Sequence, residues 1–173
     1  RGRCIFVARP AACARLQRTL GTVSDPPPPW SRREFALVGG LVVLVVVTYH
    51  RVLSAGFVNW DDNRFLVENP LFHAGGRTYI EAALTRFQFE AYQPLHLLSY
   101  LPDRYLWPER AAGFHAVELG LWILDVGLVY ALLRRHVWAP AALAACALFA
   151  LHPLCVEPVA WITSRKDLVA LAA

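Results

Sequence analysis

Three long apolar runs constrain this chain more than any other feature of its sequence. Residues 35–49 and 137–156 carry no Asp, Glu, Lys or Arg, and residues 111–133 hold only two acids. A helix needs about 20 mostly apolar residues to cross a bilayer. The valine-rich run 42–47 has strand propensity, but the length of the apolar block favours a span. We predict an all-α membrane protein with about 3–4 spans, near 35–55, 111–133, 137–152 and 167–173 onward.

Composition agrees with a membrane protein and excludes other classes. The chain is 57% hydrophobic and 17% charged, whereas soluble domains carry about 25% charged residues. A disordered chain is therefore excluded, and four cysteines in 173 residues do not indicate a disulfide-stapled domain. The chain begins at Arg1, contains no methionine and stops inside an apolar stretch. We expect it to be the N-terminal part of a longer protein.

The distribution of charge predicts how the spans are oriented. Residues 1–34 hold seven arginines, two acids and a proline run, which predicts a disordered tail, and Arg134-Arg135 follows two crossings later. Cytoplasmic segments are rich in Lys and Arg, so both are expected in the cytoplasm, the N-terminus included. The loop at about 56–110, with seven acids, is then external, and we expect an amphipathic helix over 78–89 on the membrane surface. The net charge of +4 gives no reason to expect nucleic-acid binding.

Two polar clusters share the external side in this topology. Asp61-Asp62 follows the first span; adjacent carboxylates suit a general base or a divalent metal, or they are simply helix caps or solvated acids. The second cluster follows the third span. A metal and an anionic phosphate are its candidate ligands, and anchoring of its cations to lipid headgroups is the alternative. The cluster comprises His152, Glu157, Arg165 and Lys166.

A third polar set lies inside the second span. His115, Glu118 and Asp125 fall within about a quarter of the helix circumference and form one stripe. Intramembrane acids are costly and by default functional. Helix–helix hydrogen bonding inside the bundle is the alternative, and a proton relay in a transporter is a weaker one.

Several motifs resemble one family of multispanning proteins. They are Phe57-Val58-Asn59-Trp60-Asp61-Asp62 with Glu68-Asn69-Pro70, then Tyr92-Gln93-Pro94-Leu95, Phe114-His115, and Phe149-Ala150-Leu151-His152-Pro153-Leu154-Cys155-Val156-Glu157-Pro158-Val159-Ala160-Trp161-Ile162 continuing to Arg165-Lys166-Asp167-Leu168. From about residue 50 onward the chain resembles the transmembrane and tetratricopeptide-repeat O-mannosyltransferases. That resemblance implies a GT-C glycosyltransferase helix bundle with a large first external loop.

The resemblance also implies a reaction and a membrane. Such enzymes transfer a sugar from a polyprenyl- or dolichyl-phosphate donor to a hydroxyl, often of a protein, on the extracytoplasmic side. They are multi-pass proteins of the bacterial inner membrane, the compartment favoured here, or of the endoplasmic reticulum in a eukaryote. The alternative is a non-catalytic membrane anchor for tetratricopeptide repeats that bind other proteins.

The roles that the resemblance implies fall on the external residues. Asp61 or Asp62 is the expected catalytic base. Arg165, Lys166 and His152 are the expected ligands of the donor phosphate. The expected supporting residues are Glu157, Asn69, His115 and Glu118. A divalent metal, Mg or Mn, is a candidate cofactor held by Asp62, His152 and Glu157.

Overall fold

The computed structural model describes residues 29–59, 61–88 and 91–173, and its regular elements are all helical. The predicted all-α membrane fold is confirmed. The disordered tail predicted over 1–34 lies almost wholly outside the described residues, as does Trp60. The α-helices are α2 (Arg32–Tyr49), α3 (Pro70–His73), α4 (Gly76–Thr85), α5 (Pro94–Ser99), α6 (Leu101–Leu106), α7 (Ala111–Leu133), α8 (Ala139–Ala150), α9 (Val156–Ala160) and α10 (Arg165–Ala172).

Helix α2 starts inside the segment that the sequence assigned to the tail. Ser31 accepts a hydrogen bond from the backbone N–H of Glu34 at 3.2 Å, and the Glu34 carboxylate accepts one from the backbone N–H of Ser31 at 2.8 Å. This capping box satisfies N–H groups that have no partner within the helix. Glu34 also accepts a hydrogen bond from Arg134 Nε at 2.6 Å, which ties the start of α2 to the turn after α7.

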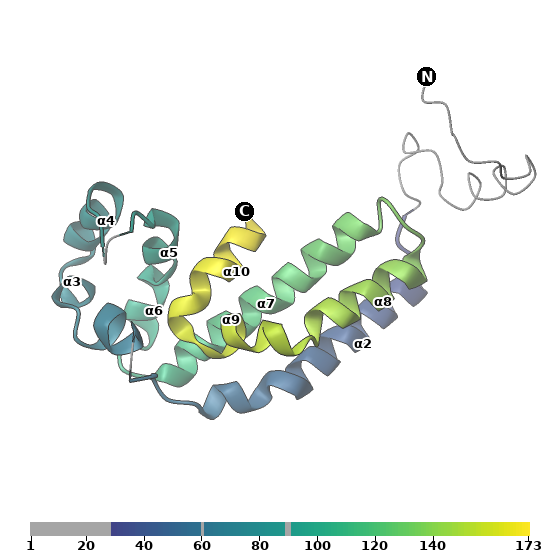
Figure 1. The fold of residues 1–173 in the computed structure, drawn as a ribbon, viewed down its shortest axis with the longest axis horizontal. Coiled ribbons are helices and arrows are strands. Elements are labelled where there is room, and N and C mark those ends of the chain that lie inside the picture. The colour runs from purple at the N-terminus through teal and green to yellow at the C-terminus, as the bar shows by residue number, and fades with distance from the viewer. Residues whose placement is uncertain (1–28, 60, 89–90) are drawn as a thin grey trace, which may run out of the picture.

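The long helices α2, α7 and α8 lie side by side in one bundle (Figure 1). Val45, Trp122 and Cys146 are buried between them. Two segments, Arg32–Ser54 and Ala111–Leu133, are long and apolar enough to cross a membrane. Exposed side chains of α2 such as Phe35 and Val43 are apolar, as expected of a surface in contact with lipid.

The third candidate span is broken. Ala139–Ala150 and Pro153–Ala160 are bent by 59° relative to each other, and together they are apolar and long enough to form one bent span. Pro153 accounts for the break, because the residue before a proline is pushed out of the helical region. His152 has ψ 135° there. The described residues therefore contain two candidate spans, or three with the bent pair.

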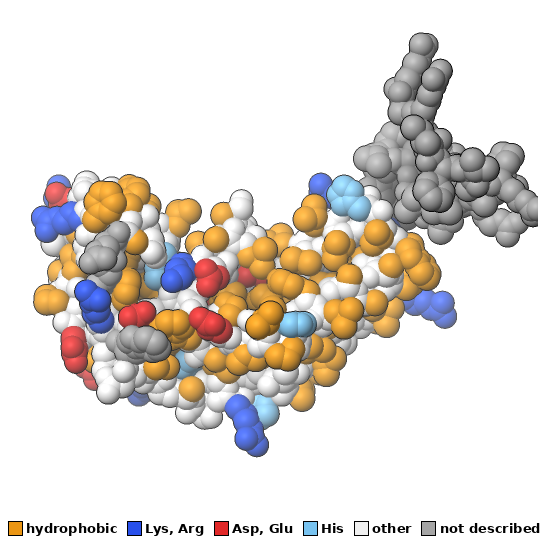
Figure 2. Space-filling model, viewed as in Figure 1, with side chains coloured by type: hydrophobic (Ala, Val, Ile, Leu, Met, Phe, Trp, Pro, Cys, Tyr) orange, Lys and Arg blue, Asp and Glu red, His pale blue; other side chains and the backbone are white. Residues whose placement is uncertain are grey.

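The predicted external loop folds into a helical cap, which comprises residues 61–88 and 91–106 with α3 to α6. It has its own apolar core, to which Phe114 of α7 and Ile162 also contribute. Figure 1 shows the cap at one end of the long helices, with α10 against α7. The helix predicted over 78–89 is α4, Gly76–Thr85. Charged side chains gather over the cap in Figure 2, while the face over the long helices is largely hydrophobic.

Candidate active site

The carboxylate of Asp62 joins the two polar clusters that the sequence placed on one side of the membrane. Its Oδ1 accepts hydrogen bonds from the Thr163 backbone N–H at 3.1 Å and from Thr163 Oγ1 at 2.8 Å. Its Oδ2 accepts one from the Val58 N–H at 2.9 Å. Asp62 is fully buried. Its hydrogen bonds attach the start of the cap to Thr163, in the segment before α10.

Asp61, which precedes the buried Asp62 in the chain, and Lys166, which follows the buried Arg165, both line one cavity of about 220 Å³. Asp61 is half-buried and Lys166 is exposed. The cavity is lined by Asp61, Arg64, Phe65, Gln93, His96, Trp161, Thr163 and Lys166. Arg64 and Phe65 come from a π-helix, Asn63–Val67, an uncommon turn that often occurs at functional sites. The cavity thus combines a carboxylate with two cations and a set of neutral hydrogen-bonding groups.

Arg165 is buried and fully engaged. Its Nε donates to Glu118 Oε1 at 2.7 Å, its Nη1 donates to Asp103 Oδ2, and Nη1 also donates to the Ser99 carbonyl at 3.0 Å. The guanidinium lies 4.3 Å from the centre of the Tyr100 ring. Arg165 therefore joins α10, α7 and the cap instead of opening into the cavity with Lys166.

The two residues of each adjacent charged pair, Asp61-Asp62 and Arg165-Lys166, therefore have different environments. Asp62 and Arg165 are buried and hold the chain, whereas Asp61 and Lys166 line the cavity. The sequence singled out all four. It did not predict which member of each pair is buried and which lines the cavity.

The other predicted site residues lie outside the cavity lining. Asn69 caps α3 by accepting from the Leu71 N–H at 3.0 Å. His152 accepts from the Leu154 N–H at 3.3 Å and is exposed, as is Glu157. No group of three or more His, Cys, Asp or Glu side chains is placed to hold a metal ion among the described residues. The metal set predicted from Asp62, His152 and Glu157 is therefore not assembled in this structure.

The predicted polar stripe of α7 is buried. His115, Glu118 and Asp125 are each fully buried. Glu118 pairs with Arg165, which fits the alternative of helix–helix bonding, but both ring nitrogens of His115 and both carboxylate oxygens of Asp125 lack a hydrogen-bond partner among the described residues.

Sequence reasoning missed several residues of the site, and three of them lie in or between α5 and α6 of the cap. Asp103 is buried beside Arg165, and its Oδ1 accepts from Trp107 Nε1 at 3.1 Å. His96 Nε2 lies 2.9 Å from the Tyr100 hydroxyl, which donates to the Ile162 carbonyl at 2.7 Å. These residues belong to short helices in a polar loop, where no apolar periodicity marks which side chains point inward.

The electrostatics around His96 keep its imidazole neutral. Burial, and then the charges of Arg165 and Lys166, lower the pKa of His96 to about 4. Burial also raises the pKa of Tyr100 well above its ordinary value. At neutral pH the inner wall of the cavity is thus uncharged and forms hydrogen bonds.

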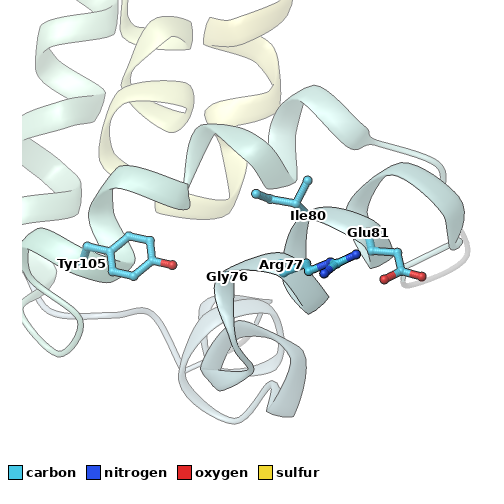
Figure 3. A pocket seen from close by; sticks show the side chains of 5 residues that line it. All are labelled: Gly76, Arg77, Ile80, Glu81 and Tyr105. Atoms are coloured by element: carbon cyan, nitrogen blue, oxygen red, sulfur yellow. The ribbon is translucent and has the colours of Figure 1, made fainter.

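A larger hollow of about 640 Å³ lies elsewhere on the cap, between α4 and α6 (Figure 3). Gly76, Arg77, Ile80, Glu81 and Tyr105 line it, and none of them is a predicted site residue. Only the smaller cavity combines residues of both polar clusters.

The fold and the site define an all-α membrane protein with a polar cavity between its helical cap and its last helices. The chain is 31% identical over 150 residues to protein O-mannosyl-transferase Tmtc1 of Drosophila melanogaster, and 34% identical over 140 residues to Tmtc2 of the same organism. These matches cover 80% and 73% of the chain. The resemblance to the transmembrane and tetratricopeptide-repeat O-mannosyltransferases that the motifs predicted is therefore confirmed.

The matches cover 17% of the length of Tmtc1 and 14% of that of Tmtc2. No protein-family profile matches the chain. No solved structure matches it significantly.

Proposed function

We propose that this chain forms part of a membrane glycosyltransferase that transfers a sugar from a polyprenyl-phosphate donor to a hydroxyl acceptor. The observation that carries the proposal is the cavity that Asp61 and Lys166 both line. A base for the acceptor and a cation for the donor are the two groups that such a transfer requires. The names of the relatives favour mannose as the sugar and a protein as the acceptor.

The reaction follows from the two charges. Asp61 accepts the proton of the acceptor hydroxyl while the hydroxyl oxygen forms a bond to the anomeric carbon of the sugar. The bond from that carbon to the phosphate oxygen breaks, and the electron pair leaves with the polyprenyl phosphate. Lys166 stabilises the negative charge that develops on this phosphate, and Arg64 lies in the same lining.

The proposed orientation places this chemistry on the extracytoplasmic side. The Arg134-Arg135 turn follows one end of α7 and the cavity-forming segments pack near the other end. The positive-inside rule then assigns the turn and the N-terminus to the cytoplasm. This arrangement supports an external cavity at the membrane surface, where a lipid-linked donor is accessible.

The test is a transfer assay with the full-length protein in liposomes, using radiolabelled polyprenyl-phosphate mannose and a serine- or threonine-containing peptide. We expect Asp61→Asn to lower the transfer rate at least 100-fold, the range of general base catalysis. Lys166→Gln should lower it as well, whereas Glu81→Gln, an exposed acid outside the cavity, should not. Full transfer by Asp61→Asn would overturn the assignment of the base. Absence of transfer from wild-type protein that still binds partners would favour a scaffold.

A further inference from the structure

One wall of the cavity carries no charge and is held by a chain of hydrogen bonds. Gln93 Oε1 lies 2.9 Å from His96 Nδ1, and His96 Nε2 lies 2.9 Å from the Tyr100 hydroxyl. Tyr100 in turn donates to the Ile162 carbonyl at 2.7 Å. His96 is 4% exposed and Tyr100 is fully buried. Gln93 is the outermost member of this chain and lines the cavity.

The number of hydrogens fixes the direction of each bond in this chain. The one hydroxyl hydrogen of Tyr100 is used on Ile162, so Tyr100 must accept from the N–H at His96 Nε2. Neutral imidazole has only one N–H, and Nδ1 is then an acceptor. The structure sets Gln93 Oε1 2.9 Å from this nitrogen, which would leave two acceptors facing each other. A half-turn of the amide brings its NH₂ group to Nδ1 and leaves the carbonyl oxygen as the outer atom of Gln93, which lines the cavity.

The remaining polar groups of the cavity suit other parts of the substrate. Lys166 is a cation that matches a phosphate, and Asp61 is an acid that matches an acceptor hydroxyl. A neutral carbonyl oxygen with a fixed direction matches instead a single hydroxyl donor. Gln93 is half-buried. A ligand without the matching hydroxyl leaves its carbonyl oxygen unpaired beside the bound sugar, and such a loss discriminates between substrates.

We infer that Gln93, held by His96, accepts a hydrogen bond from one hydroxyl of the transferred sugar and thereby selects the sugar. Gln93 is the residue that contacts the substrate, and His96 is a positioning residue that acts through it. The inference rests on the proposed function. It adds a determinant of sugar choice that is separate from the base and from the phosphate ligand.

The experiment is a competition assay with the full-length protein in liposomes. Polyprenyl-phosphate mannose and polyprenyl-phosphate glucose, which differ in the configuration of one sugar hydroxyl, are supplied together with distinct radiolabels. The ratio of the two products does not depend on how much of the protein is folded. We expect Gln93→Leu to lower the preference between donors at least tenfold. Gln88→Leu is the matched control, because Gln88 lies in the cap but not in the cavity lining.

His96→Ala tests the chain of hydrogen bonds. It should lower the preference about as much as Gln93→Leu, and the double variant should lower it no further, because both changes disable the same contact. An unchanged product ratio in Gln93→Leu, with wild-type transfer intact, would overturn the inference and leave the proposed function standing. Absence of transfer from either donor by the wild-type protein would overturn the proposed function itself.

Discussion

Asp61 and Asp62 are neighbours with opposite environments, so their variants should fail in different ways. Asp62 accepts three hydrogen bonds and is fully buried. Asn in its place turns an NH₂ group toward at least one of the N–H donors, which leaves that donor unpaired. We expect Asp62→Asn to lower the free energy of unfolding by about 1–3 kcal/mol. Asp61→Asn, measured by the same thermal melt in detergent, should change it by less than about 0.5 kcal/mol.

Arg165 and Lys166 should separate in the same manner. Arg165→Met leaves Glu118 and Asp103 buried without their cation, and a broken buried ion pair costs about 3–5 kcal/mol. Arg165→Lys should also be strongly destabilising, because one ammonium group does not replace a guanidinium that binds two carboxylates in different directions. Lys166→Gln, at an exposed position, is the control and should melt like the wild type. Similar melting of all three variants would contradict the assigned role of Arg165.

At the scale of elements, the start of α7 packs against Trp107, the residue that follows the cap, with no space between them. A Cβ added to Gly113 would lie 2.1 Å from Cγ of Trp107. Gly113→Ala must therefore displace the Trp107 ring, which donates to Asp103 next to Arg165. We expect a loss of about 1–3 kcal/mol in the free energy of unfolding.

Gly120 gives a matched control in the same helix. A Cβ there meets nothing within 4 Å, and alanine is favoured over glycine in a helix interior by up to about 1 kcal/mol. Gly120→Ala should therefore melt at the same temperature as the wild type or slightly higher. The two alanine variants are compared by thermal unfolding in one detergent. Equal destabilisation by both would show that the contact with Trp107 is not the cause.

The elements also show which parts of the structure are accessible to sequence reasoning. Helices α2 and α7 were predictable because each is a long apolar run, and length and hydropathy suffice to identify such segments. The sequence prediction ended the third span at residue 152, and the backbone before Pro153 breaks the helix there. The cap helices are mostly short, and their order in space is set by contacts distant in sequence.

The same reasoning applies to the site. The charged doublets were found because their residue types match the chemistry of sugar transfer. Adjacent residues near a helix start point in different directions, and only the packing of Thr163 and Glu118 decides which member is buried. Asp103 was predicted only as one of seven loop acids. Its pairing with Arg165 spans 62 positions of the sequence and depends on the tertiary fold.

At the scale of the whole molecule, the cavity exists only where the bundle and the cap are joined. The polar contacts that join them are Asp62 with Thr163, Tyr100 with Ile162, and Arg165 with Asp103, beside the apolar packing of Phe114 and Ile162 into the core of the cap. Buried polar networks of this kind are sensitive to the loss of any one member. Conditions that change the charge of this region should therefore loosen the cap on the bundle.

Acidification is such a condition, and the sign of the His96 contribution is defined. The pKa of His96 is about 4 in the folded protein and 6.5 ordinarily. Between these values the unfolded chain binds a proton that the folded protein does not. The contribution of His96 to stability is therefore complete above pH 6.5 and is lost as the pH falls toward 4, by on the order of 3 kcal/mol.

The measurement is the melting temperature of the full-length protein in detergent from pH 7.5 down to 4.5, compared with that of His96→Gln. Glutamine keeps hydrogen-bonding capacity and removes the titrating ring. The stability of the variant should therefore decrease less than that of the wild type between pH 6.5 and 4.5. Parallel pH curves for the wild type and His96→Gln would show that a different group responds to acid, and the neutral wall of the cavity would then need another explanation.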